Sequence, residues 1–97
     1  MDEYKLRQQQ ERGIRAKALL ENELLNEAFE GIENDLMKAW QNSMASDELG
    51  REDAWRCYQL LKNLREALKR HVITGDGAGK ELLQIQDKSK LRKVLHV

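Results

Sequence analysis

Apolar residues recur every three or four positions in two long stretches of the chain, one between residues 25 and 40 and one between residues 54 and 72. This spacing places the side chains on one face of a helix. No stretch alternates apolar and polar residues over the length of a strand, and the chain contains no proline, the strongest helix breaker. The pattern therefore predicts an all-α protein.

Polar caps and a short connection divide this pattern into three helices. Asn22 is a suitable N-cap for the second helix, and Ser46 or Asp47 for the third. Because the second and third helices are long and joined by a short loop, we expect a long antiparallel helical hairpin, with Trp40 and Trp55 near its loop end. The expected helices cover residues about 2–21, 23–43 and 48–73.

The two ends of the chain lack this clear pattern. The first helix has few apolar residues before Ile14 and contains Gly13, so we expect it to be exposed and frayed at its start. Three glycines between Gly75 and Gly79 predict a flexible joint, because glycine extends a helix poorly. We therefore expect a helical domain at 1–74, followed by a Gly-rich hinge and a basic C-terminal helix or tail at 75–97.

Composition indicates a thin core. The chain has 97 residues, of which 40% are hydrophobic and 35% are charged, and its formal net charge is zero. A single small domain of this kind often completes its core with a partner or with copies of itself. The second helix is acidic and the second half of the chain is basic, which favours attraction between the two helices of the hairpin; the alternative is a basic end that meets an acidic partner.

Residues that could carry chemistry are few. The single cysteine, Cys57, falls within the apolar pattern and is predicted to be a buried, inert thiol that forms no internal disulfide. Neither histidine has further ligands at metal-binding spacing. The stretch from Gly75 to Lys80 resembles a phosphate-binding loop only faintly, since Glu81 stands where that motif needs Ser or Thr. We therefore expect a non-enzymatic protein without a metal or cofactor. Without a signal peptide or an 18-residue apolar run, it should be soluble and intracellular.

The remaining candidates are contacts to other macromolecules. Basic residues on one side of the third helix could follow a phosphate backbone, although a solvated face paired with the acidic helix explains them better; these are Arg65, Lys69 and Arg70. Apolar residues of the first helix and the apolar and basic residues of the C-terminal tail are the predicted protein-binding positions. They are Ile14, Ala18, Leu19, Lys88, Lys90, Leu91, Arg92, Lys93 and Leu95.

Part of the sequence resembles short proteins encoded in tailed bacteriophages and prophages. The similarity covers about residues 12–72 and rests on packing and capping positions. It includes the string 15–22, Leu25, Ala28-Phe29, Asp35, Ala39-Trp40, the triplet Gly50-Arg51-Glu52 and Trp55. The tail of those proteins differs from the glycines and basic end found here.

The resemblance implies a place among phage head-assembly and DNA-packaging proteins, found in the host cytoplasm or in the virion. A structural or assembly protein that oligomerises, or that docks on a head, portal or packaging component, is then the leading hypothesis. A DNA-binding packaging subunit or regulator is the second. A phage inhibitor of a host enzyme is the third, with an acidic helix that imitates nucleic acid through Glu23, Glu27, Glu30 and Asp35.

Overall fold

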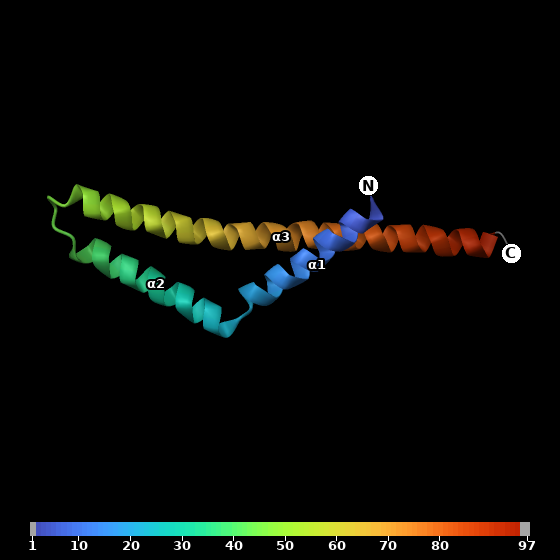
Figure 1. Ribbon diagram of the computed structural model, residues 1–97, viewed down its shortest axis with the longest axis horizontal. Helices are drawn as coiled ribbons and strands as arrows, with labels where there is room; N and C mark the ends of the chain where they lie inside the picture. The colour runs from blue at the N-terminus through green and yellow to red at the C-terminus, as the bar shows by residue number, and fades with distance from the viewer. Residues whose placement is uncertain (1, 96–97) are drawn as a thin grey trace. The chain divides into compact units, whose positions relative to one another are not determined.

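The computed structural model describes residues 2–95, and the side chains of residues 2–90. Over residues 2–95 the chain forms three helices and no strand, so the prediction of an all-α protein is confirmed (Figure 1). The helices are α1 (Glu3–Leu20), α2 (Glu23–Asn42) and α3 (Glu48–Leu95). Two compact units are present: Met1–Ala18 with Leu68–Val97, and Leu19–Ala67.

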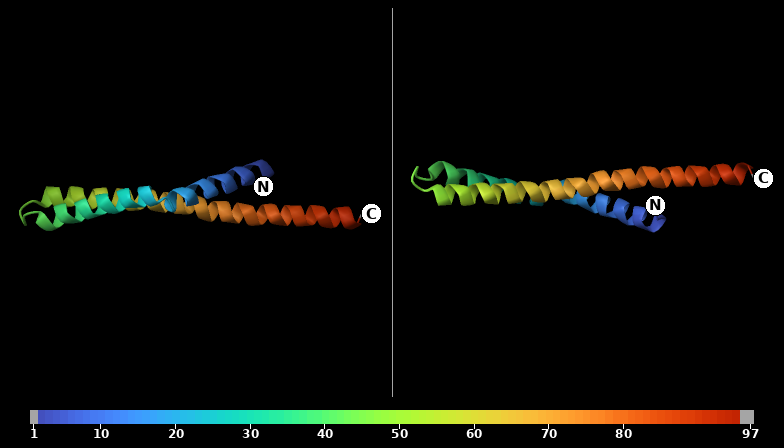
Figure 2. Two further views of the ribbon diagram at one scale, coloured as in Figure 1. Left: turned by 90° about the horizontal axis from the view of Figure 1, so that it is seen from below. Right: turned by 90° about the horizontal axis from the view of Figure 1, so that it is seen from above.

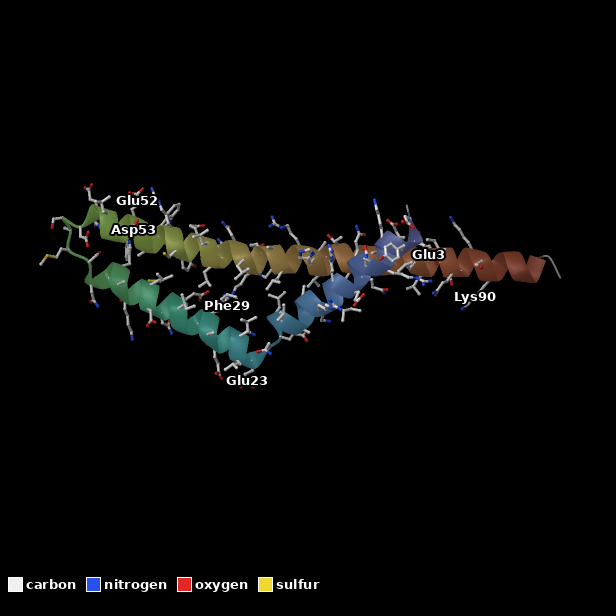
Figure 3. All side chains as sticks on the ribbon, in the orientation of Figure 1. Glu3, Glu23, Phe29, Glu52, Asp53 and Lys90 are labelled. Atoms are coloured by element: carbon white, nitrogen blue, oxygen red, sulfur yellow. The ribbon has the colours of Figure 1, made fainter. Side chains whose placement is uncertain are left out.

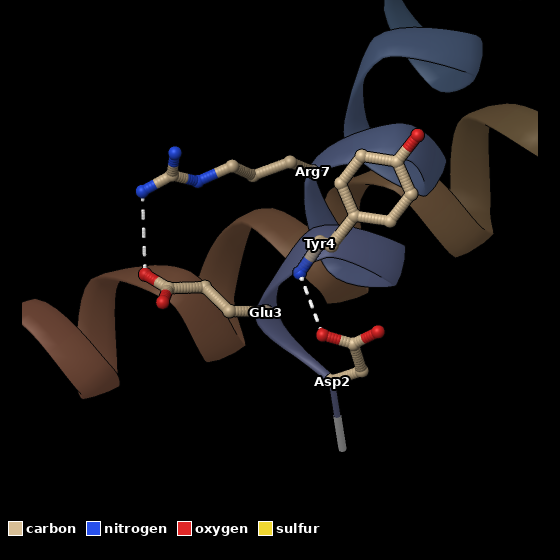
Figure 4. A network of polar contacts seen from close by, with 4 residues as sticks. All are labelled: Asp2, Glu3, Tyr4 and Arg7. Atoms are coloured by element: carbon tan, nitrogen blue, oxygen red, sulfur yellow. Dashed lines mark hydrogen bonds and ion pairs between the residues drawn. The ribbon is translucent and has the colours of Figure 1, made fainter.

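Polar residues at its first turn fix the start of α1. The carboxylate of Asp2 accepts a hydrogen bond from the backbone N–H of Tyr4 at 3.1 Å, and Arg7 pairs with Glu3 at 3.3 Å (Figure 4). An acidic cap satisfies a backbone donor that would otherwise lack a partner. The expectation of an exposed first helix holds for most of its residues but not for Leu6, Gly13 and Ala16, which are buried against the rest of this unit.

In the first unit α1 crosses the second half of α3 (Figure 2). A Cβ atom built on Gly13 would lie 2.8 Å from the Cα of Gly75 and 2.8 Å from the carbonyl oxygen of His71. The two backbones therefore touch at the crossing. Beyond this point Leu6 of α1 joins Ala78 and Leu82 of α3 in the buried cluster of the unit.

The glycine-rich stretch is part of α3, which continues without a break from Glu48 to Leu95. The expected end of this helix near residue 73, with a hinge after it, was wrong. Gly75 is buried and supplies the surface on which α1 rests, so the missing side chain serves packing instead of flexibility. The C-terminal residues continue this helix past the start of α1 (Figures 1 and 2).

In the second unit α2 contacts the first part of α3. The Asn22 side chain accepts a hydrogen bond from the backbone N–H of Leu25 at 2.8 Å, so the predicted N-cap of α2 is confirmed. Asp47 caps α3 in the same way, at 3.0 Å from the N–H of Gly50. Phe29 projects from α2 towards α3 and is the buried hydrophobic side chain described in this unit (Figure 3).

Candidate functional site

The largest aromatic side chains of the second unit surround an open cavity between α2 and α3. Its volume is about 220 Å³, and its lining is almost entirely apolar. The residues that line it are Leu36, Met37, Trp40, Ala54, Trp55 and Tyr58. Met37 and Trp40 are each 51% exposed, Trp55 is 59% exposed and Tyr58 is 39% exposed. We call the surface formed by these four the aromatic face.

Spacing explains why the aromatic face is shared by two helices. Leu36 and Trp40 are four residues apart on α2, and Ala54 and Tyr58 are four apart on α3, so each pair stacks on one side of its helix. In this unit α2 and α3 are the two packed helices, so the partner helix covers each of these side chains from one direction only. Both tryptophans therefore lie at the cavity, and about half of each remains in contact with solvent.

A charged pair lies farther along the seam, that is, the line of contact between α2 and α3. Arg65 of α3 and Glu33 of α2 are 2.7 Å apart, with 29% and 32% of their side chains exposed. The Arg65 guanidinium also lies 4.7 Å from the centroid of the Phe29 ring. The ion pair and the ring contact together hold the guanidinium at the seam, because a cation is attracted to both a carboxylate and an aromatic face.

The three residues predicted to contact nucleic acid differ in their surroundings in the structure. Arg65 is held by Glu33, as the interpretation of acidic and basic helices attracting each other predicted. Lys69 is also engaged in an interaction within the chain. Arg70 is exposed. Opposite charges thus meet between α2 and α3, and a continuous row of unpaired bases is not present at these three positions.

The predicted protein-binding residues of α1 are all exposed. Ile14 is 64% exposed and lines a groove of about 460 Å³ in the first unit, together with Lys17 of α1 and Leu83 of α3. The floor of this groove includes Gly13 and Gly75. Ala18 is exposed at the end of the same unit, and Leu19 is exposed in the second unit. Whether these positions bind a partner stays a prediction.

The C-terminal candidates fall partly outside the described side chains. Lys88 and Lys90 are exposed on the last turns of α3, and Lys90 is marked in Figure 3. The side chains of Leu91, Arg92, Lys93 and Leu95 lie outside the described residues. Their proposed role in binding stays a prediction, but the backbone that carries them is helical instead of a separate tail.

The acidic residues of α2 are exposed, as a surface imitating nucleic acid requires. Glu23, Glu27 and Glu30 follow one another at spacings of four and three residues, so they share one side of the helix. Asp35 is also exposed but is five residues from Glu30, about 140° around the helix. The four acids therefore do not form one continuous row.

The chain contains one cysteine, Cys57. Cys57 is exposed, so the prediction of a buried thiol was wrong: it lies on α3 beside the seam, where no third helix of its unit covers it. Within residues 2–95 no group of three or more histidine, cysteine or acidic residues could hold a metal ion. No helix in that range is sufficiently long and apolar to cross a membrane.

No family model, curated protein or solved structure matches this chain. The aromatic face is the site that sequence reasoning missed. Helical spacing identified Trp40, Trp55 and Tyr58 as members of an apolar side but did not include Met37, and spacing alone does not tell a buried apolar side from an exposed one.

Proposed function

We propose that this chain is a non-enzymatic assembly protein that binds other proteins through the aromatic face. The observation that carries the proposal is the half-exposed cavity lined by Trp40 and Trp55 in a chain of which 35% is charged. Exposed tryptophan and tyrosine side chains around an apolar depression are typical anchors of protein interfaces. In this proposal α2 and the first part of α3 form an antiparallel hairpin, supported by the Glu33–Arg65 pair.

The biological setting of the proposal comes from the sequence resemblance. Phage head, portal and packaging components assemble by repeated protein contacts, and a small helical chain with an open apolar face has the chemistry to dock on one of them. The chain would act in the host cytoplasm or in the virion. The helical basic end of α3, with Lys88 and Lys90 exposed, would provide a second contact to an acidic surface.

Site-directed photo-crosslinking during phage growth tests this function. A photoreactive amino acid replaces Met37 on the aromatic face, and in the control chain it replaces Asp35. The two positions are two residues apart, so they lie on nearly opposite sides of α2. We expect protein adducts from position 37 and few from position 35, with a phage structural or packaging protein, or this chain itself, in the adduct.

Other outcomes would contradict the proposal in distinct ways. Adducts to DNA in place of protein would favour the packaging subunit or regulator. Adducts to a host enzyme from an acidic position such as Glu27, with none from position 37, would favour the inhibitor. Equal labelling at positions 35 and 37 would show that the aromatic face has no special role.

A further inference from the structure

The two compact units of the chain carry opposite formal charges. The unit of residues 19–67 contains 11 acidic and 5 basic residues, so its formal charge is −6. The unit of residues 1–18 and 68–97 contains 6 acidic and 12 basic residues, so its formal charge is +6. The zero net charge of the whole chain is therefore the sum of two strongly charged units. Each unit of one copy is complementary in charge to the other unit of a second copy.

In the basic unit, the groove beside the crossing of α1 and α3 combines apolar and basic side chains. Ile14 of α1 and Leu83 of α3 line it and are 64% and 60% exposed. Lys17 and Lys80 line the same groove and are exposed, and neither forms an ion pair among the described side chains of residues 2–90. Asp76 also lines the groove, so two bases face one acid there. The groove thus offers apolar surface next to positive charge that the chain itself does not neutralise.

In the acidic unit, one side of α2 offers the complementary features. Glu23, Glu27 and Glu30 share this side and are exposed, and they form no ion pair among the described side chains of residues 2–90. Leu24 lies three residues before Glu27, so it borders the same side, and it is 75% exposed. We call this surface the acidic side of α2. It presents negative charge beside an exposed apolar side chain.

We propose that the groove between α1 and α3 binds the acidic side of α2 of a second copy of this chain. Lys17 and Lys80 pair with the acids, and Ile14 and Leu83 cover Leu24 of the second copy. A phosphate backbone would neutralise the lysines but would leave the two apolar side chains of the groove in water, so these side chains favour a protein occupant. The inference goes beyond the proposed function, because it uses a surface separate from the aromatic face. Since each copy has one groove and one acidic side, two copies bind reciprocally or the contact extends to further copies.

Reversed charges test the contact in the whole chain. The groove variant carries Lys17→Glu with Lys80→Glu, and the helix variant carries Glu27→Lys with Glu30→Lys. Each variant alone should associate about tenfold more weakly or worse in Kd than the unchanged chain, because like charges then face each other. An equal mixture of the two should associate again, since the acidic groove meets the basic helix and the unchanged groove meets the unchanged helix. Sedimentation equilibrium at low salt follows the rise in mass above the 11.3 kDa of one chain.

A matched control places the same change of charge elsewhere on α1. Lys5→Glu with Arg12→Glu serves, because the two residues are seven apart and share one side of the helix. Arg12 is five residues, about 140°, from Lys17 and so lies away from the groove. The Kd of this control should stay close to that of the unchanged chain. If the control weakens association as much as the groove variant does, the groove is not the binding site and the proposal is wrong.

Three further results would overturn the proposal. The first is an unchanged chain that is monomeric at every concentration, and the second is a mixture of the groove and helix variants that stays monomeric. The third is an unchanged chain that stays monomeric but binds a DNA duplex in a way that depends on Lys17 and Lys80, which would make the groove a nucleic-acid site. None of these results depends on crosslinking from position 37, so the proposed function and this inference can fail separately.

Discussion

At the scale of single residues, Gly13 and Gly75 set how closely α1 and α3 approach. A Cβ atom on Gly75 would lie 2.8 Å from the Cα of Gly13 and 2.9 Å from the carbonyl oxygen of Gln9. Both of these atoms belong to the backbone, so no side-chain rotation can relieve the contact. The crossing therefore requires glycine at both positions, and the helix-weakening effect of glycine is offset by the close packing it permits.

Two glycines of α3 should respond to the same substitution with opposite signs. Gly75→Ala should lower the free energy of unfolding by about 1–3 kcal/mol, because the added methyl group overpacks the crossing. Gly77→Ala should raise it by about 0.5–1 kcal/mol, since nothing lies within 4 Å of its Cβ position and alanine favours the helix. Urea denaturation followed by circular dichroism measures both. A flexible hinge would instead make both substitutions nearly neutral.

The spacing of small residues contained a signal for this crossing. Gly13 and Ala16 are three residues apart, and Gly75 and Gly79 are four apart, so each pair lies on one side of its helix. Small residues at such spacing allow two helices to touch. The sequence could not show which helix meets which, because that contact joins residues more than sixty positions apart. A run of glycines was therefore interpreted as a hinge.

At the scale of the helices, local capping was predictable because it depends on neighbouring residues. Asn22 and Asp47 were both recognised as N-cap candidates, and each accepts the expected hydrogen bond three residues ahead. The side chain of Asn26 adds to this junction by donating to the carbonyl oxygen of Leu20 at 2.8 Å. Two polar residues thus satisfy backbone groups where α1 ends and α2 begins.

The cap at Asn22 leads to a test on α2. Asn22→Ala should lower the free energy of unfolding by about 1 kcal/mol, because the N–H of Leu25 loses its acceptor. Asn22→Asp keeps the acceptor oxygen and should remain close to the original stability. Thermal unfolding followed by circular dichroism separates the two variants. If aspartate is as destabilising as alanine, the side-chain oxygen is not what holds this helix start.

The degree of exposure along α2 and α3 was less predictable than their bounds. The apolar side of α2 runs from Leu25 to Trp40, and it is wider than one neighbouring helix can cover. Phe29 is buried at 5% exposure, whereas Trp40, with the same spacing pattern, is half exposed. Periodicity along one helix does not predict this difference, because both residues belong to the same apolar side.

At the scale of the whole molecule, the described buried side chains belong to two separate units. Leu6, Ala16, Ala78 and Leu82 are buried in the first unit, and Phe29 is buried in the second. Each unit contains one part of α3 and has only a few buried side chains of its own. Small cores of this kind stabilise their own helices most strongly, so stability should differ between the two parts of the chain.

Hydrogen exchange at backbone amides should therefore report the two cores separately. Leu6→Ala removes a side chain that is 1% exposed, so it should speed exchange in α1 and in α3 after residue 68. Phe29→Ala should do so in α2 and in α3 before residue 67. Ile73→Ala, at a position that is 70% exposed, is the control and should change neither part. If either core variant instead speeds exchange evenly over residues 2–95, the continuous α3 couples the two units into one cooperative structure, and the division into two cores has no energetic meaning.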